Sequence, residues 1–291
     1  MANTRELRSR RKSITNTRKT TRTMELVAST KLRKAQEAAE SSRPYAEGMF
    51  ALVARLAAAG GDGDDVHPLM VQRAVNKVVL ILACSDRGLC GAFNVNLVKK
   101  LNDRAKDLRA AGKQVEVVTC GKKGAAILRF IGENVVEQHS GIMDAPEYSR
   151  AQDIGEGLMD DFLAGRVDSV ELIYSRYETA ARQYPDCTTL LPAGGVDAAA
   201  AADDAGGYFI YHPDAASLLE SLIPQMVKVA LFSCFLQTSA GEHAARRSAM
   251  KNATDAAGDL IKLLTRQYNR ARQGKITQEI AEIVGAVEAM A

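Results

Sequence analysis

The sequence predicts an α/β fold flanked by two long terminal helices that pair as an antiparallel coiled coil. At both ends of the chain, apolar residues recur at steps of three and four, which is the heptad pattern of coiled-coil helices. Between the ends, β-branched apolar runs alternate with helical segments, which favours a Rossmann-like, mostly parallel sheet. We therefore expect an N-terminal helix over residues 1–58, an α/β domain over 74–211 and a C-terminal helix over 213–291.

The N-terminal helix is predicted over residues 3–57, with Pro44 as its single internal breaker. Pro44 should kink the helix without ending it, because the apolar seam continues in phase on both sides. In the first half, Arg11 and Arg18 stand beside the seam residues Leu7 and Ile14, so we expect this half to be narrow, basic and poorly buried. The seam of the second half is Leu32, Ala35, Ala39, Ser42, Ala46, Met49, Val53 and Leu56.

The α/β domain is predicted to begin with a strand over residues 77–84, whose apolar β-branched run suits the centre of a sheet covered on both faces. Edge strands are expected at 188–191 and 208–211. The tract 197–207 is rich in Ala, Asp and Gly without periodicity, and we interpret it as a flexible surface insertion. Helices are expected at 94–111, 122–131 and 149–163, and further strands at 114–120, 134–138 and 169–175.

The C-terminal helix is predicted to open at Ser217, because Ser217 and Glu220 have capping-box spacing. Residues 218–236 are apolar on nearly all sides, so we expect both the α/β domain and the N-terminal helix to cover them. Two heptad series follow: Ala249, Ala253, Ala256, Leu260 and Leu263, and then Ile276, Ile280, Ile283, Val287 and Met290.

The register of the coiled coil follows from the expected helix ends near Leu56 and Asp214. Both helices rise by about 1.5 Å per residue, so the numbers of facing residues should sum to roughly 270. Residues beyond about 270 then have no partner, and the end of the second helix should project as a single helix with an exposed apolar stripe. The expected neighbours are Leu7 with Leu263, Ile14 with Ala256, and Met24 with Arg246.

Composition and charge fit a soluble globular protein of 291 residues, with 46% apolar and 25% charged residues. The net charge of +3 hides an asymmetry, because residues 1–34 hold eleven Lys or Arg against Glu6 and Glu25. The five cysteines have no metal-like spacing, which favours buried thiols in a reducing compartment. The longest apolar run is 78–84 and no signal peptide is evident, so we expect a chain that is not inserted in a membrane.

The sequence contains no convincing catalytic or cofactor-binding motif. Residues 85–94 follow the first strand, where a dinucleotide site would lie, but Gly88 and Gly91 do not form GxGxxG. A structural turn over Cys90 and Phe93 is the favoured interpretation. Cys84 and Cys90 would bridge only in an oxidising compartment. The acidic pairs at 160–161 and 203–204 lack a third metal ligand.

Glu242 and His243 are adjacent on a helix, so their side chains point about 100° apart and cannot share a proton. We expect His243 to be a surface residue. Two other functional classes remain open at this point: a nucleotide-dependent enzyme that uses the α/β domain, and a nucleic-acid-binding protein that uses the basic helix. Against the second stand 5% aromatic residues and the absence of tryptophan.

Four blocks of sequence closely resemble the γ subunit of bacterial F-type ATP synthases, and they occur in the family's order. The resemblance covers essentially the whole chain. Departures are Gly274 inside the expected helix, an expanded 197–207 tract, and the lack of the cysteine-bearing insertion of chloroplast relatives. The blocks are TMELVASTKLRKAQ (23–36), SDRGLCGAFN (85–94), EHAARRSAMKNATD (242–255) and YNRARQGKITQEIAEIV (268–284).

The resemblance implies the central rotor shaft, which couples proton-driven rotation of the c-ring to conformational change at catalytic sites on the β subunits. It implies no active site, cofactor or metal in this chain. The implied partners are the α and β subunits, the ε subunit and the membrane c-ring, without nucleic acid and without direct membrane insertion. The implied location is peripheral, on the cytoplasmic face of the bacterial plasma membrane. Positions that match contact or coupling residues of the family are Met24, Arg246, Gln273, Thr277 and Glu279.

Overall fold

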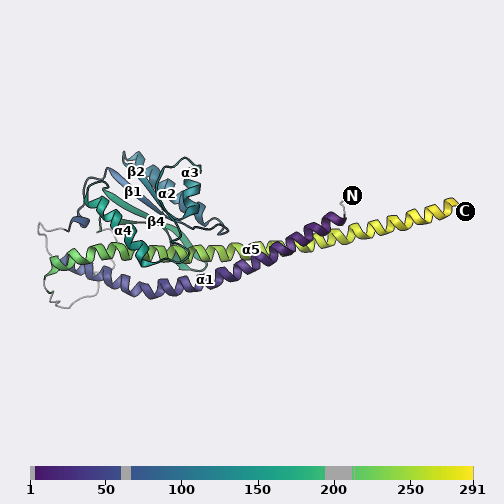
Figure 1. Ribbon diagram of the computed structural model, residues 1–291, viewed down its shortest axis with the longest axis horizontal. Helices are drawn as coiled ribbons and strands as arrows, with labels where there is room; N and C mark the ends of the chain where they lie inside the picture. Colours follow the sequence, from purple (N-terminus) through teal and green to yellow (C-terminus); the bar gives the residue numbers. More distant parts are fainter. Residues whose placement is uncertain (1–3, 60–66, 194–211, 213, 291) are drawn as a thin grey trace. The chain divides into compact units, whose positions relative to one another are not determined.

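A computed structural model describes residues 4–59, 67–193, 212 and 214–290 (Figure 1). Contacts within the chain divide it into two compact units: unit 1 is Met1–Ala28 with Arg246–Ala291, and unit 2 is Ser29–Ala245. Two long helices, α1 (Thr4–Ala59) and α5 (Ala215–Met290), contribute residues to both units. Helix α1 continues through Pro44, as predicted.

Unit 2 is built on a five-stranded sheet with the order β3-β2-β1-β4-β5. Strand β1 pairs in parallel with β2 and β4, and β2 pairs in parallel with β3, whereas β5 is antiparallel to β4. The mostly parallel sheet is as predicted. The strands are β1 (Lys77–Ala83), β2 (Gln114–Cys120), β3 (Val135–His139), β4 (Ser169–Thr179) and β5 (Arg182–Leu191).

Helices cover both faces of this sheet (Figure 1). Alternate residues of β1 point to opposite faces, and six of its seven residues are buried. On one face, Leu80 belongs to a cluster with Leu101 of α2 and Leu128 of α3. On the other face, Ile81 belongs to a cluster that includes Phe162 of α4. The remaining helices are α2 (Phe93–Ala110), α3 (Lys122–Phe130), α4 (Tyr148–Leu163) and the short η1 (Pro68–Met70).

The first part of α5 and the last part of α1 lie in the second cluster. It includes Met49 and Val53 of α1 together with Ile223, Leu231 and Phe235 of α5. The predicted burial of residues 218–236 by both the sheet and α1 is therefore confirmed. Among the described residues, α5 is also the one helix long and apolar enough to cross a membrane, by length and composition alone. Core helices of globular proteins share this length and composition.

Two local predictions need correction. Helix α5 begins at Ala215, because the Asp214 carboxylate accepts hydrogen bonds from the Ser217 backbone N–H and hydroxyl at 2.8 Å each. Asp214 is an equally good cap placed three residues earlier. Strand β5 starts at Arg182 rather than near 188. The added residues 182–187 are mostly polar and half-buried, so they give no apolar signal in the sequence. The predictions for 197–207 and 208–211 lie outside the described residues.

Unit 1 is a coiled coil whose α5 seam is one residue later than predicted. The predicted seam residues Leu260 and Leu263 are 47% and 43% exposed. Polar and aromatic residues in the seam explain the error: the hydroxyls of Thr21 and Thr254 are hydrogen-bonded at 2.8 Å, and the Arg11 guanidinium lies 5.3 Å from the Tyr268 ring centre. The buried or half-buried seam residues are Met250, Thr254, Ala257, Ile261, Leu264 and Tyr268.

The register also differs from the prediction. Residues near 249 and 259 were expected opposite Thr21 and Arg11, but Thr254 and Tyr268 lie there. The displacement exceeds one helical turn, so the predicted sum of roughly 270 is wrong. Ile14 lies near Leu260 and Leu264 rather than Ala256. Part of the reason is that α1 extends to Ala59, beyond the assumed end.

The end of α5 has the predicted exposure. From 272 to 287 every residue is exposed, and the helix continues through Gly274. Ile276, Ile280 and Ile283 are 48%, 56% and 65% exposed, so the apolar stripe has no cover within the described part of the chain.

The observed register predicts that Thr21→Cys with Thr254→Cys forms a disulfide readily under mild oxidation. The two hydroxyl oxygens are 2.8 Å apart, and a disulfide needs sulfur atoms at about 2.05 Å. Peptide mapping by mass spectrometry would identify the link. The control is Ile14→Cys with Ala256→Cys, the pair expected from the sequence, and more efficient linkage of that control would contradict the observed register.

Candidate functional site

The first candidate site is the crevice at the carboxyl ends of β1 and β4, where open α/β sheets of this type bind ligands. The turn after β1 closes on itself, because the Ser85 backbone N–H and hydroxyl donate to Asn94 Oδ1 at 3.1 and 3.0 Å. Cys90 and Phe93 are buried beneath this turn. The predicted structural turn is therefore confirmed.

Helix α5 occupies the crevice itself. A β-carbon on Gly241 would lie 2.5 Å from Ser175 Oγ and 3.5 Å from the Phe93 ring. Ser175 is the last residue of the buried part of β4. Its backbone N–H donates to Thr238 Oγ1 at 3.3 Å. This close approach leaves no room for a nucleotide between helix and strand ends, which counts against the nucleotide-dependent enzyme.

The second candidate site is a cluster of polar side chains around Asp144, which lies in the connection between β3 and α4. Lys31 of α1 donates to both carboxylate oxygens at 2.6 and 2.7 Å. Arg87 and His243 lie 3.8 and 4.0 Å from the same carboxylate. The hydrogen bond from Lys31 is the main cause that holds the pKa of the Asp144 carboxyl below its usual range.

His243 is only 1% exposed, so the prediction of a surface histidine is wrong. The neighbouring Glu242 is 2% exposed. A helical sequence shows which residues share a face, but it does not show that the α/β domain covers the face that carries His243. Asp144 carries no such signal in the sequence, because it lies outside the four blocks of resemblance.

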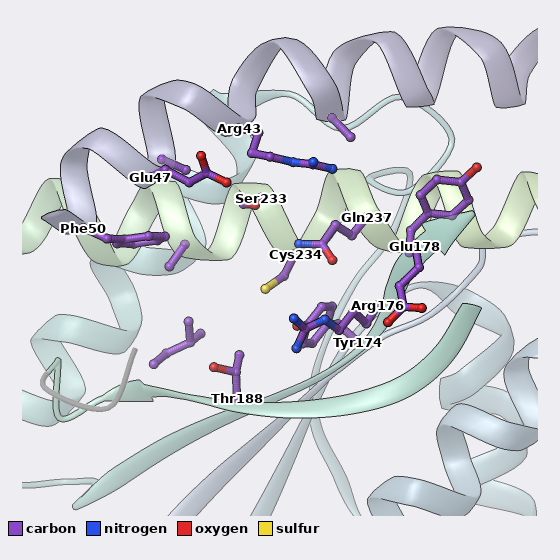
Figure 2. Close-up of a pocket in the computed structure, with 15 residues that line it drawn as sticks. Arg43, Glu47, Phe50, Tyr174, Arg176, Glu178, Thr188, Ser233, Cys234 and Gln237 are labelled. Atoms are coloured by element: carbon purple, nitrogen blue, oxygen red, sulfur yellow. The ribbon is translucent and has the colours of Figure 1, made fainter. Parts of the chain in front are cut away.

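A cavity of about 590 Å³ lies between α1, α5 and the strands β4 and β5 (Figure 2). Its groups are not arranged for catalysis: Arg176 pairs with Asp186 at 3.3 Å, and burial raises the pKa of the Cys234 thiol to about 12. The lining residues include Arg43, Glu47 and Phe50 of α1, Ser233, Cys234 and Gln237 of α5, and Tyr174, Arg176 and Glu178 of β4.

All five cysteines are free thiols, and four are buried. Burial raises the pKa of Cys84 and Cys187 to about 12, and it also raises the pKa of Cys120. Because the thiolate is the reactive form, these thiols are poor nucleophiles at neutral pH. Within the described residues, no group of three or more His, Cys, Asp or Glu could hold a metal ion.

The third candidate site is the surface of unit 1. Residues 4–28 and 246–275 hold eight Lys or Arg each, sixteen in all, against the four acids Glu6, Glu25, Asp255 and Asp259, a net charge of +12. Many of these basic side chains are exposed. The coil therefore suits an acidic partner surface.

The residues singled out by resemblance lie on unit 1 but do not form one pocket. Gln273 and Thr277 are exposed on one face of α5, where the Thr277 hydroxyl donates to the Gln273 carbonyl at 3.0 Å. Glu279 points about 160° away from Thr277 and pairs with Lys275 at 3.4 Å. Met24 of α1 is 38% exposed. Arg246 is half-buried and lies about 40 Å along α5 from Gln273.

Comparison with known proteins gave concordant results. A sequence model of the family described as "ATP synthase" matches residues 3–290. The ATP synthase gamma chain of Leptospira biflexa is 40% identical over 292 residues, covering 100% of both chains. That of Rhodopirellula baltica is 40% identical over 296 residues, covering 100% of this chain and 99% of the relative.

A chain in the cryo-EM structure of the Euglena gracilis mitochondrial ATP synthase (OSCP/F1/c-ring, rotational state 3) has the same fold. Its TM-score is 0.68 at 19% identity, with 99% of this chain and 94% of that chain covered.

The close approach of α5 predicts that Gly241→Val lowers the melting temperature of the isolated chain. The side chain would overlap Ser175, and such overpacking costs about 1–3 kcal/mol, or about 2–12 °C for a unit of this size. Gly274→Val is the matched control, because nothing lies within 4 Å of its β-carbon position. Equal melting temperatures of the two variants, measured by circular dichroism, would contradict the tight packing.

Proposed function

This chain belongs to the family of ATP synthase γ chains, and on that premise we propose how its surfaces serve the enzyme. The γ chain is the central rotor shaft of F-type ATP synthase, which couples proton-driven rotation of the c-ring to conformational change at the catalytic sites. It is a non-catalytic subunit, and those sites are on the β subunits. The full-length match to bacterial γ chains carries this conclusion.

We propose that the helices over residues 1–58 and 213–291 form the shaft of the rotor and that the α/β domain over residues 74–211 forms its foot. The α and β subunits are the proposed partners of unit 1. Two observations support them: the net charge of +12 over residues 4–28 and 246–275, and the exposed stripe of Ile276, Ile280 and Ile283. An apolar stripe of this extent favours a covering protein surface.

The ε subunit and the c-ring are the proposed partners of unit 2. The rotor belongs to a membrane-associated complex, and we place it on the cytoplasmic face of the bacterial plasma membrane, without direct insertion. Within unit 1, the proposed contacts with the β subunits are Met24, Arg246, Gln273, Thr277 and Glu279. Exposed Gln273 and Thr277 offer a polar face, whereas Glu279 serves a different face of the same helix.

The direct test of the function is complementation. Bacterial membranes that lack their γ chain should regain ATP synthesis when this chain is supplied with its own α, β and ε subunits. The rival functions are tested on the isolated chain. Tight binding of NAD or ATP in calorimetry, or firm DNA binding in a mobility shift at physiological salt, would contradict the rotor assignment.

The exposed stripe predicts that Ile280→Asp with Ile283→Asp weakens assembly with the α and β subunits while the isolated chain keeps its helix content. Burying such a side chain is worth roughly 1.5–3 kcal/mol, and two charges would remove that gain. Circular dichroism of the variant and the yield of reconstituted complex measure the two effects.

The matched control is Gln278→Asp with Ala281→Asp, which adds the same charge to the opposite face of the helix. Loss of helix content in the Ile280 and Ile283 variant would show that the stripe is internal core. Equal yields for the two double variants would show that the stripe contributes little to assembly.

A further inference from the structure

The cluster around Asp144 joins both shaft helices to the α/β domain within unit 2. Lys31 comes from α1, His243 from α5, and Arg87 from the turn between β1 and α2. Their distances to the carboxylate are 2.6, 4.0 and 3.8 Å, respectively. One carboxylate on the sheet domain therefore lies beside groups from both helices and from a second loop of the domain.

The partly covered surroundings of Asp144 favour a hydrogen-bonded ion pair of defined geometry. The Lys31 and Asp144 side chains are 35% and 34% exposed, and His243 is 1% exposed, so water reaches one side of the cluster while the other is covered. Charge-assisted hydrogen bonds are stronger than neutral ones and require a defined geometry. Lys31 meets both oxygens of the carboxylate, which restricts the position of that side chain further.

Apolar packing alone restrains the helices less strictly. The cluster that includes Met49, Val53, Leu231 and Phe235 holds α1 and α5 on the sheet, but the hydrophobic effect has no directional preference. Small rotations of a helix about its own axis preserve much of such a contact. Single polar links also occur, such as Lys228 of α5 with Glu156 of α4 at 2.6 Å. Asp144 differs because it faces both helices.

We propose that Asp144 is a positioning residue that fixes the rotational setting of α1 and α5 on the α/β domain, so that torque passes between the foot and the shaft without slip. The inference rests on the proposed function as a rotor. It assigns no role to Asp144 in the chemistry of ATP, and it explains why a carboxylate is placed where both helices approach one loop.

The test uses the complete ATP synthase in inverted membrane vesicles. For Asp144→Asn we expect ATP hydrolysis within about twofold of the unsubstituted enzyme, because the catalytic sites lie on other subunits. We expect ATP-driven proton pumping per ATP hydrolysed to fall at least twofold. A matched control is Asp161→Asn, whose partner Arg166 belongs to the same α/β domain, and this variant should keep the ratio.

Two substitutions of Lys31 provide a second route if Asp144→Asn does not assemble. Lys31→Met should lower the pumping ratio and Lys31→Arg should restore it, because arginine keeps the charge and the donors. In the double variant Lys31→Met with Asp144→Asn, the loss should be no larger than in either single variant, because both act through one interaction.

An unchanged pumping ratio in Asp144→Asn, or in Lys31→Met where the former does not assemble, would overturn the proposal. An equal loss of the ratio in the Asp161→Asn control would also overturn it, because the effect would then reflect general destabilisation. Failure of the proposed function is recognised separately: the unsubstituted chain would then not support pumping or ATP synthesis at all.

Discussion

The close packing of helix α5 against the carboxyl ends of β1 and β4 is the constraint on which the rest of unit 2 depends. At Gly241 the absence of a side chain lets the helix approach Ser175 and Phe93, and the Thr238 hydroxyl accepts a hydrogen bond from the end of β4. In doubly wound sheets this crevice is the ligand site. Because α5 packs in this crevice, it occupies the place where a ligand would bind. The α/β domain, a fold often used by enzymes, here holds a long helix.

The 76 residues of α5 pass through three environments that differ in how far the helix is buried. The first part is a core helix, with Ile223 and Leu231 fully buried. The middle part is a narrow seam in which Thr254 and Tyr268 contact α1 through a hydrogen bond and a cation–π contact. The last part is exposed. A long helix is stabilised mainly by the packing of its faces, so burial in the first part anchors a helix that is progressively less covered toward its end.

Polar contacts stand among the apolar residues of the unit 1 seam and help to define its register. A polar residue at a seam position specifies alignment at a cost in stability. The pairs Thr21 with Thr254 and Arg11 with Tyr268 have this character. Thr21 and Arg11, the members of these pairs that belong to α1, lie among basic residues. A shaft of this kind is aligned but thin, and its surface is available for charged contacts with other chains.

Most helices and strands of this protein could be predicted from its sequence, because each depends on local patterns. The β-branched run of β1 and the steps of three and four in the terminal helices predicted the fold, and four blocks of sequence indicated the family. The heptad phase of α5 was misjudged by one residue, because apolar periodicity counts Leu260 and Leu263 and overlooks Thr254 and Tyr268. The error in register followed from helix ends, which depend on capping and packing that short windows of sequence specify poorly.

The contacts between distant segments depend on how whole elements pack and cannot be predicted from local sequence. The sequence leaves His243 and Asp144 ninety-nine positions apart and shows neither that His243 is buried nor that Lys31 reaches the Asp144 carboxylate. It also does not reveal that Gly241 meets Ser175 in the crevice of the sheet. The physical reason is the same in each case: periodicity records which residues share a face, whereas the packing of whole elements determines which face is covered and by what.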